Sequence, residues 1–83
     1  MGKSKSPISS DIRKLRFEHG EMTQKQLADM VGVTRQTIIA MEQGKYSPSL
    51  ELAFRIAYVF DTSIENVFHF EPEDAFVKKV QES

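Results

Sequence analysis

The sequence predicts an all-α fold, and three kinds of residue placement lead to this prediction. Serine and threonine residues suited to cap helices recur along the chain, apolar residues follow them at helical spacing, and glycine or proline stands where most of these runs end. We therefore expect helices near residues 9–19, 24–31, 35–43, 50–60 and 64–68, with no strand before residue 66. A chain of 83 residues holds one small hydrophobic core, so these five helices should form one compact domain.

The composition narrows the function classes before any motif is considered. Cysteine is absent, which excludes disulfides and thiolate zinc sites, and no apolar run approaches the ~20 residues of a membrane span. The net charge is −1, but residues 1–48 carry eight lysines and arginines against five carboxylates, whereas residues 49–83 carry three against seven. We expect a soluble, cytoplasmic protein without a membrane partner, whose basic half can approach a polyanion.

The first expected helix begins at a pair of serines. Ser9 or Ser10 should cap it, with Asp11 in the first turn, where the helix dipole favours an anion. Gly20 should end it. Its apolar side is expected to comprise Ile12, Leu15 and either Phe17 or His19.

The second helix carries a capping box. The Thr23 hydroxyl should accept a hydrogen bond from a free backbone N–H of the first turn, while Gln26 reaches back to the backbone of Thr23. Gly32 is expected to end the helix in the left-handed conformation, and Thr34 then caps the next helix. The buried face should consist of Leu27, Ala28 and Val31, with Val33 pointing inward after the turn.

The third expected helix has a second face, opposite the stripe that the core buries. Ile38 and Met41 fall together as a buried stripe. The opposite arc holds Arg35, Gln36, Ile39, Ala40 and Gln43, with Thr37 near the boundary. An exposed Arg-Gln pair on the first turn is typical of a helix that enters the major groove of DNA by its N-terminal end. Helix, glycine turn and helix together form a helix-turn-helix signature.

Beyond Gly44 the chain should form a loop and two more helices. Pro48 disfavours a helix at the residue before it, so the donors of Lys45, Tyr46 and Ser47 either contact phosphate or lie in a solvated loop. Ser49 and Ser63 are expected to cap the last two helices. The expected core positions there are Leu50, Ala53, Ile56, Ala57, Phe60, Ile64, Val67 and Phe68, whereas Phe54 and Tyr58 lie off this stripe and either face solvent or meet a partner.

The two ends of the chain are less regular. Residues 1–7 are expected to form a flexible arm whose Lys3 and Lys5 can touch phosphate. At the other end, Pro72 can open a helix, whose shared face would then hold Phe76, Val77 and Val80. Alternatively, Phe68, Phe70 and Phe76 stand on extended chain that pairs across a dimer, or the tail folds back and completes the core of its own chain.

The chain resembles a known family, the phage-repressor and Cro-like helix-turn-helix regulators of XRE type. The residues that carry the resemblance are Thr23-Gln24, Leu27-Ala28, Gly32-Val33, Thr34-Arg35-Gln36-Thr37-Ile38, Glu42, Gly44-Lys45, Pro48-Ser49-Leu50 and Ile64 to Phe68. The resemblance implies a lambda-repressor-like DNA-binding domain over residues 8–68, followed by a C-terminal extension over residues 69–83. It also implies an ion pair between Arg16 and Glu42, and a Gln24 that bonds a phosphate and braces the recognition helix.

From these observations we expect a sequence-specific regulator of transcription that binds double-stranded DNA as a homodimer. The expected base contacts are Arg35, Gln36, Ile39 and Ala40. The expected backbone contacts are Gln24, Thr34, Thr37, Gln43, Lys45, Tyr46 and Ser47. The expected dimer interface includes Phe68, Phe70, Phe76, Val77 and Val80. The alternative is a protein-interaction module, such as an antitoxin or an adaptor, built on the same fold.

Catalysis is not expected. His19 and His69 are the two histidines, and neither a cysteine nor a glycine-rich phosphate loop accompanies them. The acidic run after His69, which holds Glu71, Glu73 and Asp74, is typical of a solvated surface rather than a metal site. We therefore expect no catalytic residue, no cofactor, no metal and no small-molecule effector.

Overall fold

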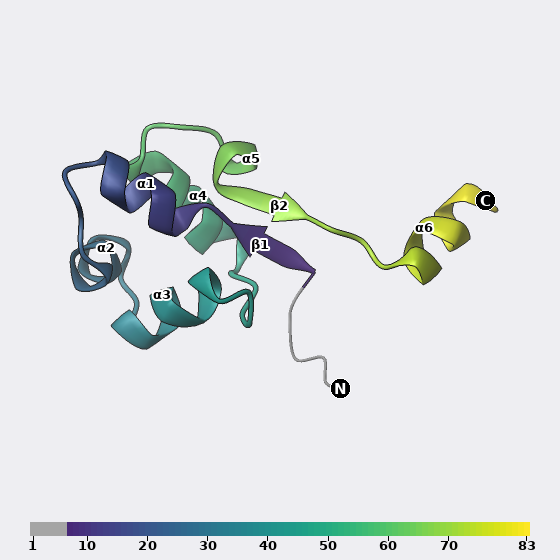
Figure 1. The fold of residues 1–83 in the computed structure, drawn as a ribbon, viewed down its shortest axis with the longest axis horizontal. Helices are drawn as coiled ribbons and strands as arrows, with labels where there is room; N and C mark the ends of the chain where they lie inside the picture. The colour runs from purple at the N-terminus through teal and green to yellow at the C-terminus, as the bar shows by residue number, and fades with distance from the viewer. Residues whose placement is uncertain (1–6) are drawn as a thin grey trace.

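The computed structural model describes residues 7–83, in which six helices and two short strands follow one another (Figure 1). In order these are β1 (Ile8–Ser10), α1 (Ile12–Glu18), α2 (Gln24–Val31), α3 (Arg35–Glu42), α4 (Leu50–Val59), α5 (Ile64–Val67), β2 (Phe68–Phe70) and α6 (Asp74–Gln81). Helices α1 to α5 surround one core, and α6 extends away from it at the C-terminus. The expected N-terminal arm, with Lys3 and Lys5, lies outside the described residues apart from Pro7.

The prediction that no strand precedes residue 66 is wrong, because β1 and β2 form a two-stranded antiparallel sheet. Ser9 lies opposite His69 in this sheet, so the two serines serve as strand residues rather than helix caps. The first helix consequently starts at Ile12, and the Asp11 that precedes it makes no side-chain cap. The Asp11 carboxylate instead lies 2.9 Å from Nε2 of His69, and its backbone N–H donates to the carbonyl of Val67 at 2.8 Å.

The core follows the apolar stripes expected from the sequence. It consists of Ile12, Leu27, Ala28, Val31, Ile38, Met41, Leu52, Ile56, Ala57, Phe60 and Val67. Two residues considered for the apolar stripes are exposed instead: Leu50, the first residue of α4, is 70% exposed, and Phe17 of α1 is 54% exposed. The His19 ring instead takes the place beside the core, with its centroid 5.1 Å from that of Phe60.

The predicted caps of α2, α3 and α4 are confirmed. Thr23 and Gln26 form the complete capping box, and the Thr34 and Ser49 side chains each accept a backbone N–H of the first turn. Gly32 ends α2 with a φ of 84°, the left-handed conformation that a side chain would disfavour. Ser63 precedes α5 as expected, but its side chain forms no capping hydrogen bond.

The C-terminal extension combines two of the arrangements expected for it. Its first part is extended, as one alternative proposed, but β2 pairs with β1 of its own chain. Its second part is α6, which begins at Asp74, two residues after Pro72, and buries none of its residues. The fold is thus mostly helical with a small sheet, and the prediction of a purely α-helical five-helix domain is corrected accordingly.

Candidate nucleic-acid interface

The third helix presents a polar face because its apolar face is used by the core. Ile38 is fully buried and Met41 is 2% exposed, while Arg35 and Gln36 on the first turn are exposed. The Thr34 side chain fixes the start of the helix by accepting the Thr37 N–H at 3.3 Å. Its first turn is therefore held in place while its two long polar side chains face solvent.

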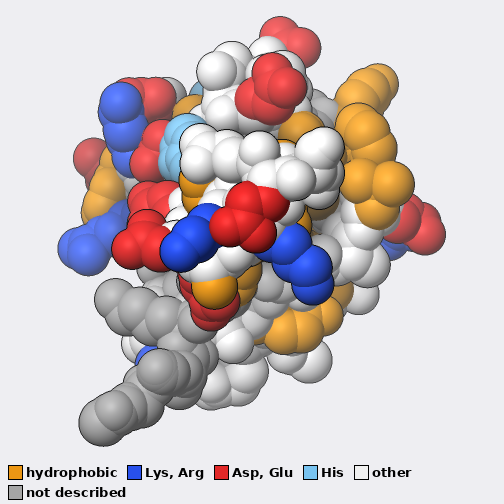
Figure 2. All heavy atoms as spheres, turned by 90° about the vertical axis from the view of Figure 1, so that its right-hand side faces the viewer, with side chains coloured by type: hydrophobic (Ala, Val, Ile, Leu, Met, Phe, Trp, Pro, Cys, Tyr) orange, Lys and Arg blue, Asp and Glu red, His pale blue; other side chains and the backbone are white. Residues whose placement is uncertain are grey.

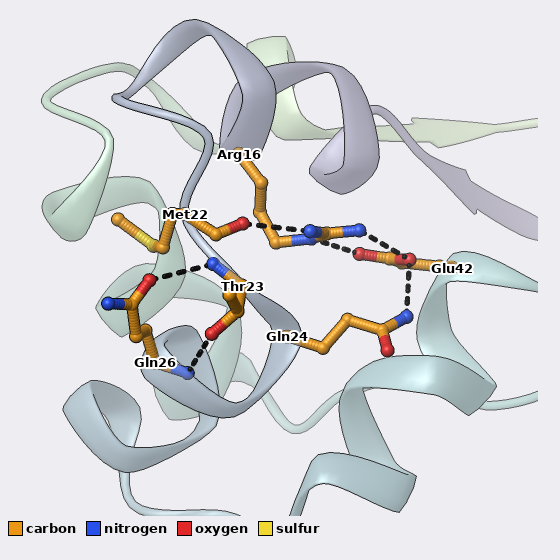
Figure 3. Close-up of polar contacts among 6 residues, drawn as sticks. All are labelled: Arg16, Met22, Thr23, Gln24, Gln26 and Glu42. Atoms are coloured by element: carbon orange, nitrogen blue, oxygen red, sulfur yellow. Dashed lines mark hydrogen bonds and ion pairs between the residues drawn. The ribbon is translucent and has the colours of Figure 1, made fainter.

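The end of α3 is fixed by a buried charge network (Figure 3). The Arg16 guanidinium donates from Nε to Oε2 of Glu42 at 2.7 Å and from Nη2 to Oε1 at 3.2 Å, so the implied ion pair is formed with two hydrogen bonds. Arg16 also donates to the Met22 carbonyl at 2.8 Å, and Gln24 donates to Oε1 of Glu42 at 3.0 Å. The Glu42 carboxylate thus joins α1, α2 and α3, and Arg16 adds the α1–α2 turn, which sets the orientation of the third helix.

A groove of about 640 Å³ lies between α1, the start of α2 and α3. It contains four of the residues expected to contact DNA: Gln24, Arg35, Ile39 and Gln43. The rest of its lining consists of Arg13, Arg16, Phe17, Glu21, Met22, Thr23, Lys25 and Glu42. Four cations and two carboxylates therefore meet here, and the Glu42 carboxylate is neutralised by Arg16, which leaves a positively charged groove next to the first turn of α3.

The match to a known protein family covers the helices that form this groove. Residues 12–67 match the family model described as helix-turn-helix. The chain belongs to the XRE-type helix-turn-helix family of transcriptional regulators. The predicted resemblance is confirmed, and the matched range includes α2, the Gly32 turn and α3.

Individual relatives agree with the family assignment. A protein of Archaeoglobus fulgidus, named an uncharacterized HTH-type transcriptional regulator, is 51% identical over 67 residues, which is 81% of this chain and 94% of that protein. The CTXphi cryptic-phage transcriptional repressor RstR of Vibrio cholerae is 38% identical over 57 residues, 69% of this chain and 50% of the repressor. The crystal structure of a transcriptional regulator from Listeria innocua has a TM-score of 0.61 at 22% identity, over 89% of this chain and 75% of that one, a likeness of fold.

The other expected contact residues lie around the helix-turn-helix but outside the groove. Gln36 is exposed on α3 and Ala40 is half-buried there. Thr34 and Thr37 lie within hydrogen-bond distance of each other, with their hydroxyl oxygens 3.1 Å apart. Lys45, Tyr46 and Ser47 are all exposed in the loop after α3, and Tyr46 lines a separate hollow beside Gly32 and Arg55.

Three cationic residues near the helix-turn-helix were not among the contacts predicted from the sequence. Arg13 and Lys25 line the groove, the latter within 3.1 Å of Asp29. Arg55 donates from Nη1 to the carbonyl of Val31 at 3.0 Å and so links α4 to the end of α2. Arg13 stands three residues before Arg16 and four before Phe17, a helical spacing that does indicate a shared face. Only the packing of α1 against α2 and α3 shows that this face meets the groove.

The residues expected to form a dimer interface divide into two groups. Phe70, Phe76 and Val80 are each more than half exposed, whereas Phe68 packs against the core and Val77 is partly buried. The Phe70 and Phe76 rings meet edge to face with centroids 6.0 Å apart, which connects β2 to α6. Figure 2 views the molecule from the α6 end and shows acidic and basic side chains interleaved there, with exposed hydrophobic side chains at the margin.

Neither a metal cluster nor a membrane-spanning helix is found in the described part of the chain. No group of three histidine or carboxylate side chains in residues 7–83 is placed to hold a metal ion. No helix in this range is long and apolar enough to cross a bilayer. His69 contacts Asp11 across the sheet rather than the acidic run that follows it.

Proposed function

We propose that this helix-turn-helix regulator binds specific sites in double-stranded DNA as a homodimer, with one α3 in the major groove of each half-site. The observation that carries the proposal is the geometry of α3. Arg35 and Gln36 are exposed on its first turn, while the Glu42 network anchors its other end to α1 and α2. A groove-reading helix needs this arrangement, because base contacts are specific only when the helix has a fixed orientation.

Each side chain on the exposed face suits a particular contact. Arg35 can donate two hydrogen bonds to O6 and N7 of guanine, and Gln36 can pair with N6 and N7 of adenine. Ile39 and Ala40 suit thymine methyl groups. The proposed contacts to the sugar-phosphate backbone, which set the register, are Gln24, Thr34, Thr37, Gln43, Lys45, Tyr46 and Ser47.

The homodimer follows from the size of the required specificity. Specific binding usually exceeds non-specific binding by ~4–10 kcal/mol, and one Arg-Gln pair contributes ~1–3 kcal/mol per good contact. Two protomers double the contacts if their recognition helices lie about 34–36 Å apart, one turn of DNA. The exposed Phe70, Phe76 and Val80 lie on β2 and α6, away from the helix-turn-helix, and supply an apolar surface for the partner, together with Phe68 and Val77.

Selection from a library of random duplexes tests the proposal. Wild-type protein should enrich a two-fold symmetric motif. Arg35→Ala should relax the preference at one position of each half-site, whereas Lys45→Ala should weaken all sequences alike and reduce the salt dependence. Enrichment of no motif by wild-type protein would refute sequence-specific binding, and an unchanged motif with Arg35→Ala would remove Arg35 from base recognition.

A protein-interaction function, as in an antitoxin or an adaptor, is the second candidate. The observation that favours it is an apolar patch of Met30, Phe54 and Tyr58 on α2 and α4, whose side chains are 59%, 57% and 87% exposed. The same selection separates the two functions, since an adaptor should enrich no DNA motif. In that case Phe54→Ser should abolish capture of the protein partner, whereas Arg35→Ala should not.

A further inference from the structure

We infer that Arg13 and Phe17 of α1 form a second site for a DNA backbone phosphate, on the wall of the groove that faces the recognition helix. The inference rests on the proposed DNA binding and adds to it a contact outside the helix-turn-helix. Arg13 supplies the phosphate ligand, and Phe17 acts as a positioning residue for its guanidinium.

The first argument is the continuity of the groove. Arg13 and Phe17 line the same groove as Arg35 and Ile39, although they come from α1 and the other two from α3. A duplex that places its major groove over the first turn of α3 brings the flanking sugar-phosphate strands against the elements on either side of that helix. The far wall of the groove is therefore where a phosphate is expected, and Arg13 is exposed there.

The second argument concerns which cations remain available. Arg16 is 7% exposed and is engaged by Glu42, and Lys25 is paired with Asp29. Within residues 7–83, by contrast, no carboxylate lies within ion-pair distance of Arg13. Its charge is thus uncompensated at the groove, and a phosphate can bind it without first displacing a protein carboxylate.

The third argument is the unusual position of Phe17. Its ring is 54% exposed and is not part of the core, yet it lies near two guanidinium groups. The Cζ atoms of Arg13 and Arg16 stand 5.8 and 5.7 Å from the ring centroid, both within cation–π distance. Stacking on a ring restricts the rotamers of an arginine but leaves the N–H groups at its edge free to donate. Phe17 therefore prepares Arg13 for a phosphate, which lowers the entropy lost on binding.

The test measures the affinity for a selected duplex between 50 and 200 mM salt. Each phosphate contact on B-DNA contributes about 0.9 to the slope of log affinity against log salt. Arg13→Ala should therefore reduce the slope by about 0.9 for each protomer, or about 1.8 for a homodimer on two half-sites, so that the deficit of the dimer relative to wild type shrinks about 12-fold over this salt range. The matched control is Lys14→Ala, which removes the same charge from an exposed neighbour that does not line the groove and should change the slope little.

Variants of Phe17 test its positioning role. Phe17→Leu keeps apolar bulk without an aromatic face and should weaken binding to all sequences in the same direction as Arg13→Ala, but by a smaller factor. Phe17→Trp keeps an aromatic face and should retain wild-type affinity. Neither variant should change the selected motif or the unfolding midpoint.

Three outcomes would overturn parts of the inference. Equal slopes for Arg13→Ala and Lys14→Ala, with wild-type DNA binding intact, would remove the phosphate site while leaving the proposed function standing. Wild-type affinity in Phe17→Leu would remove the positioning role. Absence of DNA binding by the wild-type protein would refute the proposed function itself, and this inference with it.

Discussion

Helices α3 and α6 have the same length of eight residues, but they expose opposite kinds of surface. In α3 the apolar residues Ile38 and Met41 are buried, and the exposed face is polar and cationic. In α6 no residue is buried, and Phe76 and Val80 are 51% and 55% exposed. The exposed chemistry of each helix fits the partner proposed for it, a polyanion for α3 and another protein surface for α6.

The two helices also differ in how they are held. Helix α3 has a side-chain cap at Thr34 and a buried ion pair at Glu42. Helix α6 has no side-chain cap, and its ring contact to Phe70 ties it to β2. An isolated helix of this length is marginal in water, so α6 would gain stability from the partner proposed to cover it. The orientation of α3 is fixed within the monomer, whereas the function proposed for α6 depends on a second copy.

The largest expected effect on stability comes from a substitution that breaks the anchoring of α3. Glu42→Ala should lower the free energy of unfolding by about 3–5 kcal/mol, because it leaves the Arg16 guanidinium buried without its counter-charge. Denaturant titration measures this loss. The control is Asp29→Ala, which removes an exposed pair with Lys25 and should cost less than about 1 kcal/mol. Similar losses in the two variants would show that the Arg16–Glu42 pair is no more important than a surface pair.

Removal of residues 73–83, which include α6, tests the role proposed for that helix. The truncated chain retains both strands and the hydrogen bond from the Glu71 N–H to the Pro7 carbonyl, so its unfolding free energy as a monomer should change by less than about 0.5 kcal/mol. It should sediment as a monomer and bind a duplex with two half-sites at least about 100-fold more weakly, because the second contact is no longer intramolecular.

Point variants on α6 refine this result. Phe76→Ser should reproduce the loss of dimer, whereas Lys78→Ala, which lies on another face of the same helix, should not. A truncated protein that still dimerises would show that the interface lies elsewhere, for example at Phe54 and Tyr58.

Loss of a helix cap should cost less stability, and the cost should differ between α3 and α6. Thr34→Ala removes the acceptor for the Thr37 N–H and should cost about 1 kcal/mol of stability, seen as a lower melting temperature. Glu73→Ala, at the corresponding position of α6, should leave the melting temperature unchanged, since this side chain makes no cap and α6 is not part of the core. An equal decrease in both variants would indicate that α6 unfolds together with the domain.

The smallest expected effect concerns the apolar part of the α3 surface. Replacing single thymines by uracil in the selected duplex should lower affinity by about 0.8 kcal/mol where Ile39 or Ala40 covers the methyl group. Titration of the substituted duplexes measures this difference. Equal affinity for every substituted duplex would mean that neither side chain meets a thymine methyl.

The helix-turn-helix could be predicted almost completely from the sequence. The cap at Thr23, the turn at Gly32 and the cap at Thr34 depend on residues within a few positions of one another, and local patterns record such contacts well. Strand β1 could not be predicted in this way, because its pairing partner lies about sixty residues away and Ser9 and Ser10 are equally suited to cap a helix.

The residues of the candidate site also divide into those that local sequence patterns predict and those that depend on tertiary packing. The exposure of Arg35 and Gln36 followed from the helical period of α3 alone. The place of Arg13 in the groove depends on how α1 packs against the other helices, which no local pattern records. Phe17 was left open between core and surface, because an aromatic residue at the edge of an apolar stripe fits either, and the structure places it beside two arginines.

The pairing of Ile8 with Phe70 has a consequence for the order in which the protein folds. Contacts between residues so far apart in sequence must pay for the closure of a long loop, so they form late compared with local helical contacts. During synthesis β1 leaves the ribosome about sixty residues before β2, so it gains its partner strand only after α1 to α5 have emerged. The helix-turn-helix can therefore assemble on a nascent chain in which β1 and β2 are not yet paired.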